Sequence, residues 1–305
     1  MNNSLKTTLL CCSLTLLVTG CGGGGGSSAV VKRSFTSFSA IPANSIVDIE
    51  GQSVEFSYVA NTNPTSIIIT GTSNPSTDPT AKSSLTYNDS GEISKLSIVT
   101  DKGTVSWDSA TDTFDYSTSP LLTVNSPDFS EVGFTLLPLN IGWDYQTLGT
   151  WVTETTTGSG ASGRLGSISV GSRTDGSAVP TTGTATFTGA TSGFYIDSAG
   201  TLFYVLGNTS INADFANRSL AFTTSNNNTV NINTEVASVN SDLNLSGTLT
   251  YSAGSNNFSG SVTGTGLTGS ASGYFYGPSA EEAGGTFALT GGGVEIYTGA
   301  FGAKR

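Results

Sequence analysis

The sequence predicts an all-β protein in which an N-terminal β-rich domain precedes an eight-stranded antiparallel β-barrel that does not span a membrane. Three observations support this prediction: 39 of the 305 residues are glycine, only 11% are charged, and apolar residues alternate with polar ones in short runs. Alternation with a period of two is typical of strands with one buried face, and frequent glycine is typical of turns and tightly curved sheets. We expect two domains that meet near residue 142.

The first twenty residues differ from the rest of the chain. Lys6 supplies a small positive region, and residues 9–18 are mostly apolar, a run too short to span a bilayer as a helix. The run continues into LVTGC at residues 17–21, which resembles the lipobox of bacterial lipoproteins. This resemblance implies that residues 1–20 are a lipoprotein signal peptide and that Cys21 is acylated and inserted into the lipid bilayer.

Lipidation of Cys21 would also determine whether a disulfide can form and which membrane holds the protein. Cleavage before Cys21 removes Cys11 and Cys12, and the sulfur that remains carries lipid, so no disulfide is expected. Residues 22–28 are glycine and serine only, and we expect residues 21–34 to be the lipidated cysteine and a flexible tether. Glycine follows the lipidated cysteine, in place of the aspartate of an inner-membrane retention signal, which predicts the outer membrane of a diderm bacterium.

The composition excludes several classes of function. The net charge of −11 makes nucleic acid and anionic headgroups poor partners for the folded part of the chain. The absence of histidine removes the usual general base, the usual zinc ligand and the Ser-His-Asp triad together. Because the remaining cysteine is expected to carry lipid, we predict no catalytic residue, no cofactor, no metal site and no enzyme activity.

Two groups of carboxylates are candidate sites, each with a structural alternative. Glu281 and Glu282 are neighbours, which point to opposite sides of an extended chain and cannot flank one bond as a glycosidase pair does. We expect both on a solvated turn between two strands. Asp108, Asp112 and Asp115 could bind calcium, but they lack the ligand spacing and central glycine of an EF-hand loop, so the alternative is solvated hairpin acids.

Tyrosine is the one axial haem ligand that the composition leaves. Tyr274, Tyr276 and Tyr297 are the candidates, and the alternative is packing with a hydrated hydroxyl. Alternation places Tyr274 and Tyr276 on one face of a strand and Phe275 on the other.

Two regions of alternation predict the two domains. Residues 35–142 contain short apolar runs separated by turn sequences such as NDSG at residues 88–91, which predicts a meander of six to eight strands. Residues 143–305 contain eight or nine more regular runs, which can close into a barrel. The outward positions there are mostly Ser, Thr, Asn and Asp, unlike the apolar band of a transmembrane barrel.

Four stretches of the C-terminal half resemble the β-barrel domain of transferrin-binding protein B and related surface lipoproteins. The resemblance extends over residues 143–305 and implies that residues 35–142 form the β "handle" domain of that family. The stretches are GTATFTG at 183–189, ADFA at 213–216, GYFYGPSAEEAGG at 273–285 and GAFGAKR at 299–305.

The resemblance also implies a function. It predicts an outer-membrane, surface-exposed lipoprotein that binds a protein or an iron- or metal-bearing solute and passes it to a TonB-dependent transporter, after export by a dedicated translocon. The chain has one handle and one barrel where the best-known receptor has two of each, so transferrin is not carried over as the ligand and no ligand-binding residue is identified. The alternative is a structural, adhesive or protective surface lipoprotein without a small ligand.

Overall fold

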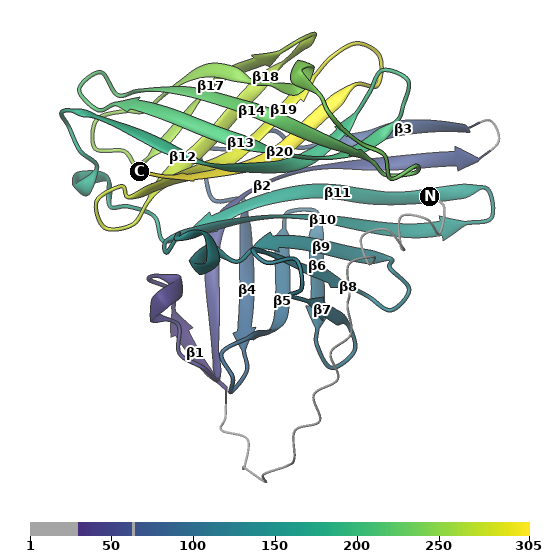
Figure 1. Ribbon diagram of the computed structural model, residues 1–305, viewed down its shortest axis with the longest axis horizontal. Helices are drawn as coiled ribbons and strands as arrows, with labels where there is room; N and C mark the ends of the chain where they lie inside the picture. The colour runs from purple at the N-terminus through teal and green to yellow at the C-terminus, as the bar shows by residue number, and fades with distance from the viewer. Residues whose placement is uncertain (1–29, 63–64) are drawn as a thin grey trace.

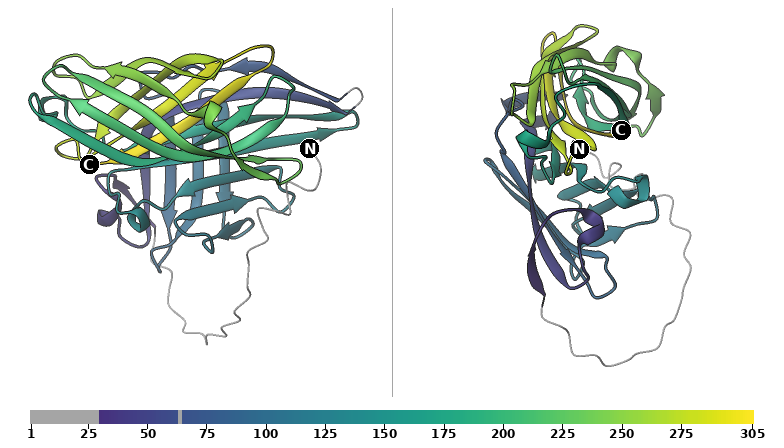
Figure 2. Two further views of the ribbon diagram at one scale, coloured as in Figure 1. Left: turned by 45° about the horizontal axis from the view of Figure 1, so that its top comes forward. Right: turned by 90° about the vertical axis from the view of Figure 1, so that its left-hand side faces the viewer.

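The computed structural model describes residues 30–62 and 65–305, which form two large β-sheets (Figure 1). One sheet is curled into a half-barrel, and the other closes into a barrel that lies across the first (Figure 2). The predicted all-β fold with an eight-stranded antiparallel barrel is confirmed. The predicted signal peptide, Cys21 and residues 22–28 lie outside the described residues.

The curled sheet has eleven strands, in the order β6-β5-β4-β2-β11-β10-β9-β8-β7, with β1 and β3 also paired to β2. Its strands are β1 (Val31–Ser34), β2 (Ser45–Thr62), β3 (Thr65–Thr72), β4 (Ala81–Tyr87), β5 (Ile93–Thr100), β6 (Gly103–Asp108), β7 (Thr113–Asp115), β8 (Leu121–Asn125), β9 (Glu131–Leu136), β10 (Gln146–Thr157) and β11 (Gly160–Gly171).

The barrel runs β13-β12-β20-β19-β18-β17-β16-β14, and pairing of β13 with β14 closes it, while β15 pairs with β14 outside the ring. Its strands are β12 (Thr184–Ile196), β13 (Leu202–Asp214), β14 (Ser219–Asn231), β15 (Ala237–Val239), β16 (Ser246–Thr250), β17 (Asn257–Gly264), β18 (Leu267–Tyr276), β19 (Glu282–Thr290) and β20 (Ile296–Lys304). Four short 3-10 helices are η1 (Phe38–Ala40), η2 (Pro138–Ile141), η3 (Gly176–Ala178) and η4 (Ser241–Leu243). No helix in the described ranges is long and apolar enough to cross a bilayer.

The hairpin of β10 and β11 differs from expectation. We expected strands from Trp143 onward to lie in the barrel, but this hairpin pairs with β9 and β2 of the curled sheet. The two sheets therefore divide between Gly171 and Thr184, and not at residues 142 and 143. Val152 of the hairpin packs on the barrel side and Trp151 on the opposite side, so alternation alone could not show which sheet the hairpin joins.

The start of the described chain also differs from expectation. Residues 31–34, expected at the end of the flexible tether, form β1 and pair in parallel with Ser45–Asp48 of β2. All four side chains of β1 are exposed, and the strand is placed by backbone pairing together with an ion pair between Lys32 and Asp48 of β2 (2.8 Å). The described part of residues 35–142 contains eight strands, β2 to β9, in agreement with the six to eight expected.

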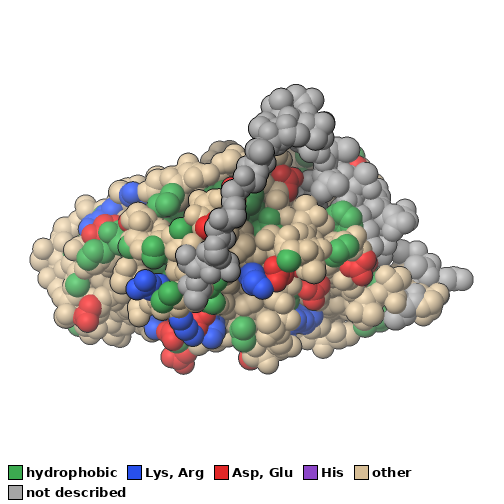
Figure 3. Space-filling model, turned by 90° about the horizontal axis from the view of Figure 1, so that it is seen from below, with side chains coloured by type: hydrophobic (Ala, Val, Ile, Leu, Met, Phe, Trp, Pro, Cys, Tyr) green, Lys and Arg blue, Asp and Glu red, His purple; other side chains and the backbone are tan. Residues whose placement is uncertain are grey.

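The middle of the curled sheet is buried on both faces. On one face Phe56 and Leu165 pack with Phe194 of the barrel wall. On the other, concave face Ile49 and Ile168 join a second apolar cluster. Where described residues are visible from below, hydrophobic side chains are scattered singly or in small groups among charged and other groups (Figure 3).

The barrel interior is filled by aromatic side chains around Phe275. The ring centroid of Phe275 lies 5.3 Å from those of Tyr251 and Phe258 and 6.0 Å from that of Phe215, in tilted and edge-on arrangements. Such pairs contribute beyond the burial of their area, so this ring should be a main source of barrel stability.

We predict that Phe275→Ala lowers the free energy of unfolding by about 3–5 kcal/mol, because it removes a fully buried ring and leaves a cavity. Phe203→Ala, at a partly buried position of the same cluster, should cost about half as much. Urea unfolding followed by circular dichroism measures both. Equal losses in the two variants would contradict the central place of Phe275.

Candidate functional site

The glutamate pair of the GYFYGPSAEEAGG stretch does not lie on a fully solvated turn, as we expected. Glu281 is only partly exposed, and its Oε2 accepts a hydrogen bond from the Ser279 amide at 2.8 Å within the turn. Glu282, in contrast, begins β19 and is fully buried, facing outward from the barrel towards the curled sheet. The expectation for Glu282 was wrong because its burial depends on a distant segment of the chain.

That segment is the start of β10. The Glu282 carboxylate accepts hydrogen bonds from three consecutive amides, those of Asp144 (2.7 Å), Tyr145 (3.1 Å) and Gln146 (3.0 Å). Burial raises the pKa of Glu282 above its ordinary value, and the three amides oppose this by favouring the carboxylate. The arrangement is a structural clamp, since all three donors are backbone groups.

Gln146 extends the clamp along the barrel wall. Its Nε2 donates to the backbone oxygens of Ala283 (2.9 Å) and Ala303 (3.0 Å), which belong to the neighbouring strands β19 and β20. A Cβ at Gly284 would lie 2.0 Å from Oε1 of Gln146, so only glycine leaves room for this side chain. The contact therefore fixes the register between the sheet and the barrel.

The outward residues of β20 become smaller towards its end, in the order Ile296, Thr298, Ala300 and Gly302, and all are buried. Trp143 fills the space beside the smallest of them: a Cβ at Gly302 would lie 2.7 Å from its ring. Part of the barrel's outer wall is thus an interface with the curled sheet, and not a solvated surface.

The candidate haem ligands are all packing residues. Tyr274 and Tyr276 face the curled sheet and Phe275 the barrel interior, as predicted. Tyr274 donates to the Thr77 oxygen at 2.7 Å, and the Tyr276 hydroxyl lies 3.4 Å from Oγ of Ser169. Desolvation raises the pKa of Tyr274, Tyr276 and Tyr297, so their phenols stay protonated at neutral pH and are poor ligands for iron.

The aspartates of the β6–β7 region stabilise turns. Oδ1 of Asp108 accepts from the Ala110 amide (3.0 Å), Asp112 accepts from the Asp108 amide (2.7 Å) and Asp115 from the Ser117 amide (2.8 Å). Within the part of the chain that the structure describes, no group of three or more His, Cys, Asp or Glu side chains is placed to hold a metal ion.

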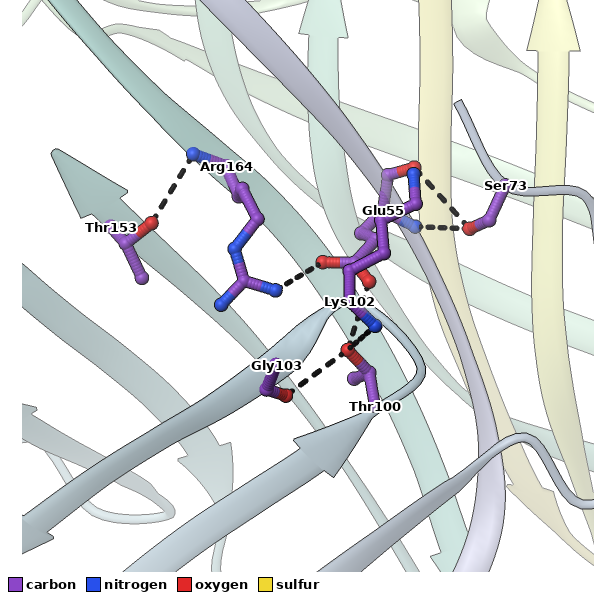
Figure 4. Close-up of polar contacts among 7 residues, drawn as sticks. All are labelled: Glu55, Ser73, Thr100, Lys102, Gly103, Thr153 and Arg164. Carbon is purple, nitrogen blue, oxygen red and sulfur yellow. Dashed lines mark hydrogen bonds and ion pairs between the residues drawn. The ribbon is translucent and has the colours of Figure 1, made fainter. Parts of the chain in front are cut away.

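A second buried carboxylate, Glu55 of β2, was not identified from the sequence. Its Oε2 lies 3.0 Å from Nη1 of Arg164 on β11, and its Oε1 accepts from the Thr100 hydroxyl at 2.9 Å (Figure 4). The Glu55 side chain is 1% exposed and that of Arg164 is 20% exposed. The Glu55 backbone amide also donates a hydrogen bond to the Ser73 hydroxyl at 2.7 Å. The contacts of Glu55 therefore connect β2 with β11, with the end of β5 and with the segment after β3.

The concave face of the curled sheet contains a cavity with a volume of about 300 Å³. Its walls come from β4, β5, β9, β10 and β11, and its rim from η1 and η2. Apolar side chains such as Leu85, Leu96 and Ile98 form most of the lining. A cavity of this size with apolar walls can hold a small molecule, and we call it the concave pocket.

A family model described as the C-lobe and N-lobe β-barrels of Tf-binding protein B matches residues 179–305. The C-terminal barrel is therefore similar to the barrels of transferrin-binding protein B. The predicted resemblance is confirmed for residues 179–305, whereas residues 143–178, which we had included in it, lie outside the match. The match begins after β11, which agrees with the division of the two sheets between Gly171 and Thr184.

Solved structures of transferrin-binding protein B are also similar. The chain is 16% identical to intact Ap-TbpB with its N and C lobes, at a TM-score of 0.44, over 82% of this chain and 46% of that one. It is 14% identical to the isotype 1 protein of serogroup B Neisseria meningitidis, with a TM-score of 0.44, and the match covers 74% of this chain and 51% of that one. A double mutant of the protein from Haemophilus parasuis is 12% identical, with a TM-score of 0.42, and the match covers 87% of this chain and 76% of that one. The chain spans about half the length of the first two proteins, and the comparison with curated proteins finds no match.

We predict that Glu282→Ala lowers the free energy of unfolding by about 3–5 kcal/mol, because three amides, one of a buried residue and two of partly buried residues, lose a charged acceptor together. Glu281→Ala is the matched control and should cost less than about 1 kcal/mol, because its carboxylate is partly hydrated. Chemical unfolding compares the two variants. Similar small losses would show that the clamp contributes little.

We predict that Arg164→Met lowers the free energy of unfolding by about 3 kcal/mol, since Glu55 is left as a buried charge with one hydroxyl donor. Adding Glu55→Gln should restore part of the loss by removing that charge. Lys95→Met breaks the exposed ion pair with Asp108 and should cost less than about 1 kcal/mol. A double variant no more stable than Arg164→Met would contradict this account, and thermal unfolding provides the comparison.

Proposed function

We propose that the protein is a lipid-anchored, surface-exposed outer-membrane protein that binds a ligand without catalysis. The observation that supports this most is the transferrin-binding protein B-type barrel over residues 179–305, built onto the curled sheet by the clamp at Glu282. Two of the solved structures to which the chain is similar carry the name of transferrin-binding protein B. The proposed ligand is a protein, or a solute that brings its own metal.

The proposal that a solute would bring its own metal follows from the side chains of the described residues. Across residues 30–62 and 65–305 no acidic cluster is placed for a metal, and the candidate tyrosines stay protonated. A metal would therefore arrive already coordinated. Transfer of the ligand to a TonB-dependent transporter, and export by a translocon, are further parts of the proposal.

The alternative function is a structural, adhesive or protective coat protein. A receptor should bind one partner from spent medium or host serum saturably, whereas a coat protein should not. Exposure to protease on intact cells tests the location: we expect the protein to be degraded there. Survival on intact cells, with loss only after permeabilisation, would contradict surface display.

We predict that Cys21→Ser releases the protein from the membrane fraction, because it removes the acylation site. Cys12→Ser is the matched control and should leave the protein membrane-bound, since residue 12 lies in the proposed signal peptide. Fractionation and mass spectrometry of the N-terminal peptide measure both. Membrane retention of the Cys21→Ser protein would exclude lipidation at this residue as the anchor.

A further inference from the structure

The concave pocket lies on the side of the curled sheet that faces away from the barrel. The barrel wall packs on Phe56 and Leu165, whereas the pocket is lined mainly by residues of the opposite face, such as Ile168 and Val170, although Phe134, which packs on the barrel, is also among its lining residues. A ligand in the pocket would therefore not compete with the sheet and barrel contacts. The pocket is separate from any partner surface on the barrel loops.

The rim of the pocket is held in place by hydrogen bonds. The Phe38 amide of η1 donates to the backbone oxygen of Asp144 at 2.7 Å, and the Ser39 amide and hydroxyl donate to its carboxylate at 2.7 and 2.8 Å. The backbone amide of Asp144 in turn donates a hydrogen bond to the Glu282 carboxylate at 2.7 Å. The 3-10 helices η1 and η2, drawn purple and teal at the lower left of Figure 1, contact each other at this rim. The pocket is thus formed before any ligand enters.

The lining of the pocket is almost free of charge. Among the described residues that line it, Glu92 is the one charged side chain, and it is exposed at the rim. No lysine or arginine of the described chain lines the pocket, so an anionic ligand would lose its hydration without gaining a counter-charge. The lining therefore favours a neutral ligand with an apolar body.

Two tyrosines, Tyr87 and Tyr116, lie among the uncharged polar residues of the lining, which also include Ser83, Thr147 and Thr150. The Tyr116 hydroxyl donates to the Ile93 oxygen at 2.9 Å, whereas that of Tyr87 has no hydrogen-bond partner among the described residues. Burial raises the pKa of Tyr116 to about 12, and the pKa of Tyr87 is raised as well, by burial and by the neighbouring Tyr116. Tyr87 therefore stays protonated and presents a free O–H donor at the pocket.

We propose that the concave pocket is a binding site for a neutral small molecule with an aromatic or alicyclic body and one hydrogen-bond acceptor, which Tyr87 binds. This site is independent of the protein or metal-bearing ligand proposed above. The walls select the apolar body, Tyr87 selects the acceptor, and the lack of basic side chains excludes anions.

Titration of the purified protein with prodan tests the proposal. Prodan is a neutral naphthalene ketone whose emission shifts to the blue in apolar surroundings, so it matches the proposed chemistry. We expect saturable binding of one molecule per chain, with affinity about fivefold weaker in Tyr87→Phe, which removes the donor alone. The anionic anilinonaphthalene sulfonate should bind at least tenfold more weakly than prodan.

Filling the pocket should abolish this binding. Ser83→Leu adds volume at a buried lining position, and we expect at least a tenfold loss of prodan affinity. Ser106→Leu places the same side chain at an exposed position of β6 outside the pocket, and should bind prodan as the wild type does. Ile98→Phe fills the pocket from β5 and replaces Ser83→Leu if circular dichroism shows that the latter is unfolded.

Three results would overturn the proposal. They are the absence of saturable prodan binding, unchanged affinity in both folded filling variants, and equal affinity for prodan and the sulfonate. Prodan affinity that falls as the protein concentration rises would show that a second copy occupies the pocket, and would also overturn it. None of these results bears on surface display or on capture of a protein partner, so failure here is distinguishable from failure of the proposed function.

Discussion

The buried carboxylate of Glu282 accepts hydrogen bonds from three consecutive amides at the point where the barrel wall, the start of β10 and η1 meet. Buried backbone donors without acceptors are costly, so these residues could not lie against the barrel unless a group on β19 accepted their hydrogen bonds. The same segment carries Asp144, which holds η1, and Gln146, which bridges β19 and β20. One side chain thus determines how the two sheets are joined and where the rim of the pocket lies.

The joint also depends on the absence of side chains. Gly284 makes room for Gln146, and Gly302 makes room for Trp143. Domains with small polar interfaces usually move relative to each other, whereas a large and closely packed apolar interface prevents such motion. The buried cluster around Phe56 and Phe194 gives this interface its apolar part. We expect the sheet and the barrel to move as one body, which presents the loops of both in a constant arrangement.

Local pattern predicted a large part of this structure. Alternation identified the barrel strands and the opposite orientations of Tyr274 and Phe275, because side-chain direction in a strand depends on the neighbouring residues alone. It could not assign the β10–β11 hairpin to a sheet, since both of its faces are buried. It missed the role of Glu282 because the amides that bury it are 136 to 138 residues away. The concave pocket, formed by five strands and two short helices, had no local signal either.

Native-state hydrogen exchange of the amides of Asp144, Tyr145 and Gln146 measures the clamp most directly, because exchange requires these bonds to open. If the clamp joins the two sheets, the free energy of opening for these amides should equal that of the most protected barrel amides, such as those of β19 and β20. If these amides instead exchange with a much lower free energy of opening, close to that of an exposed turn amide such as Gly91, the claim that the clamp joins the two sheets is contradicted. The barrel would then remain folded while the sheet separates from it.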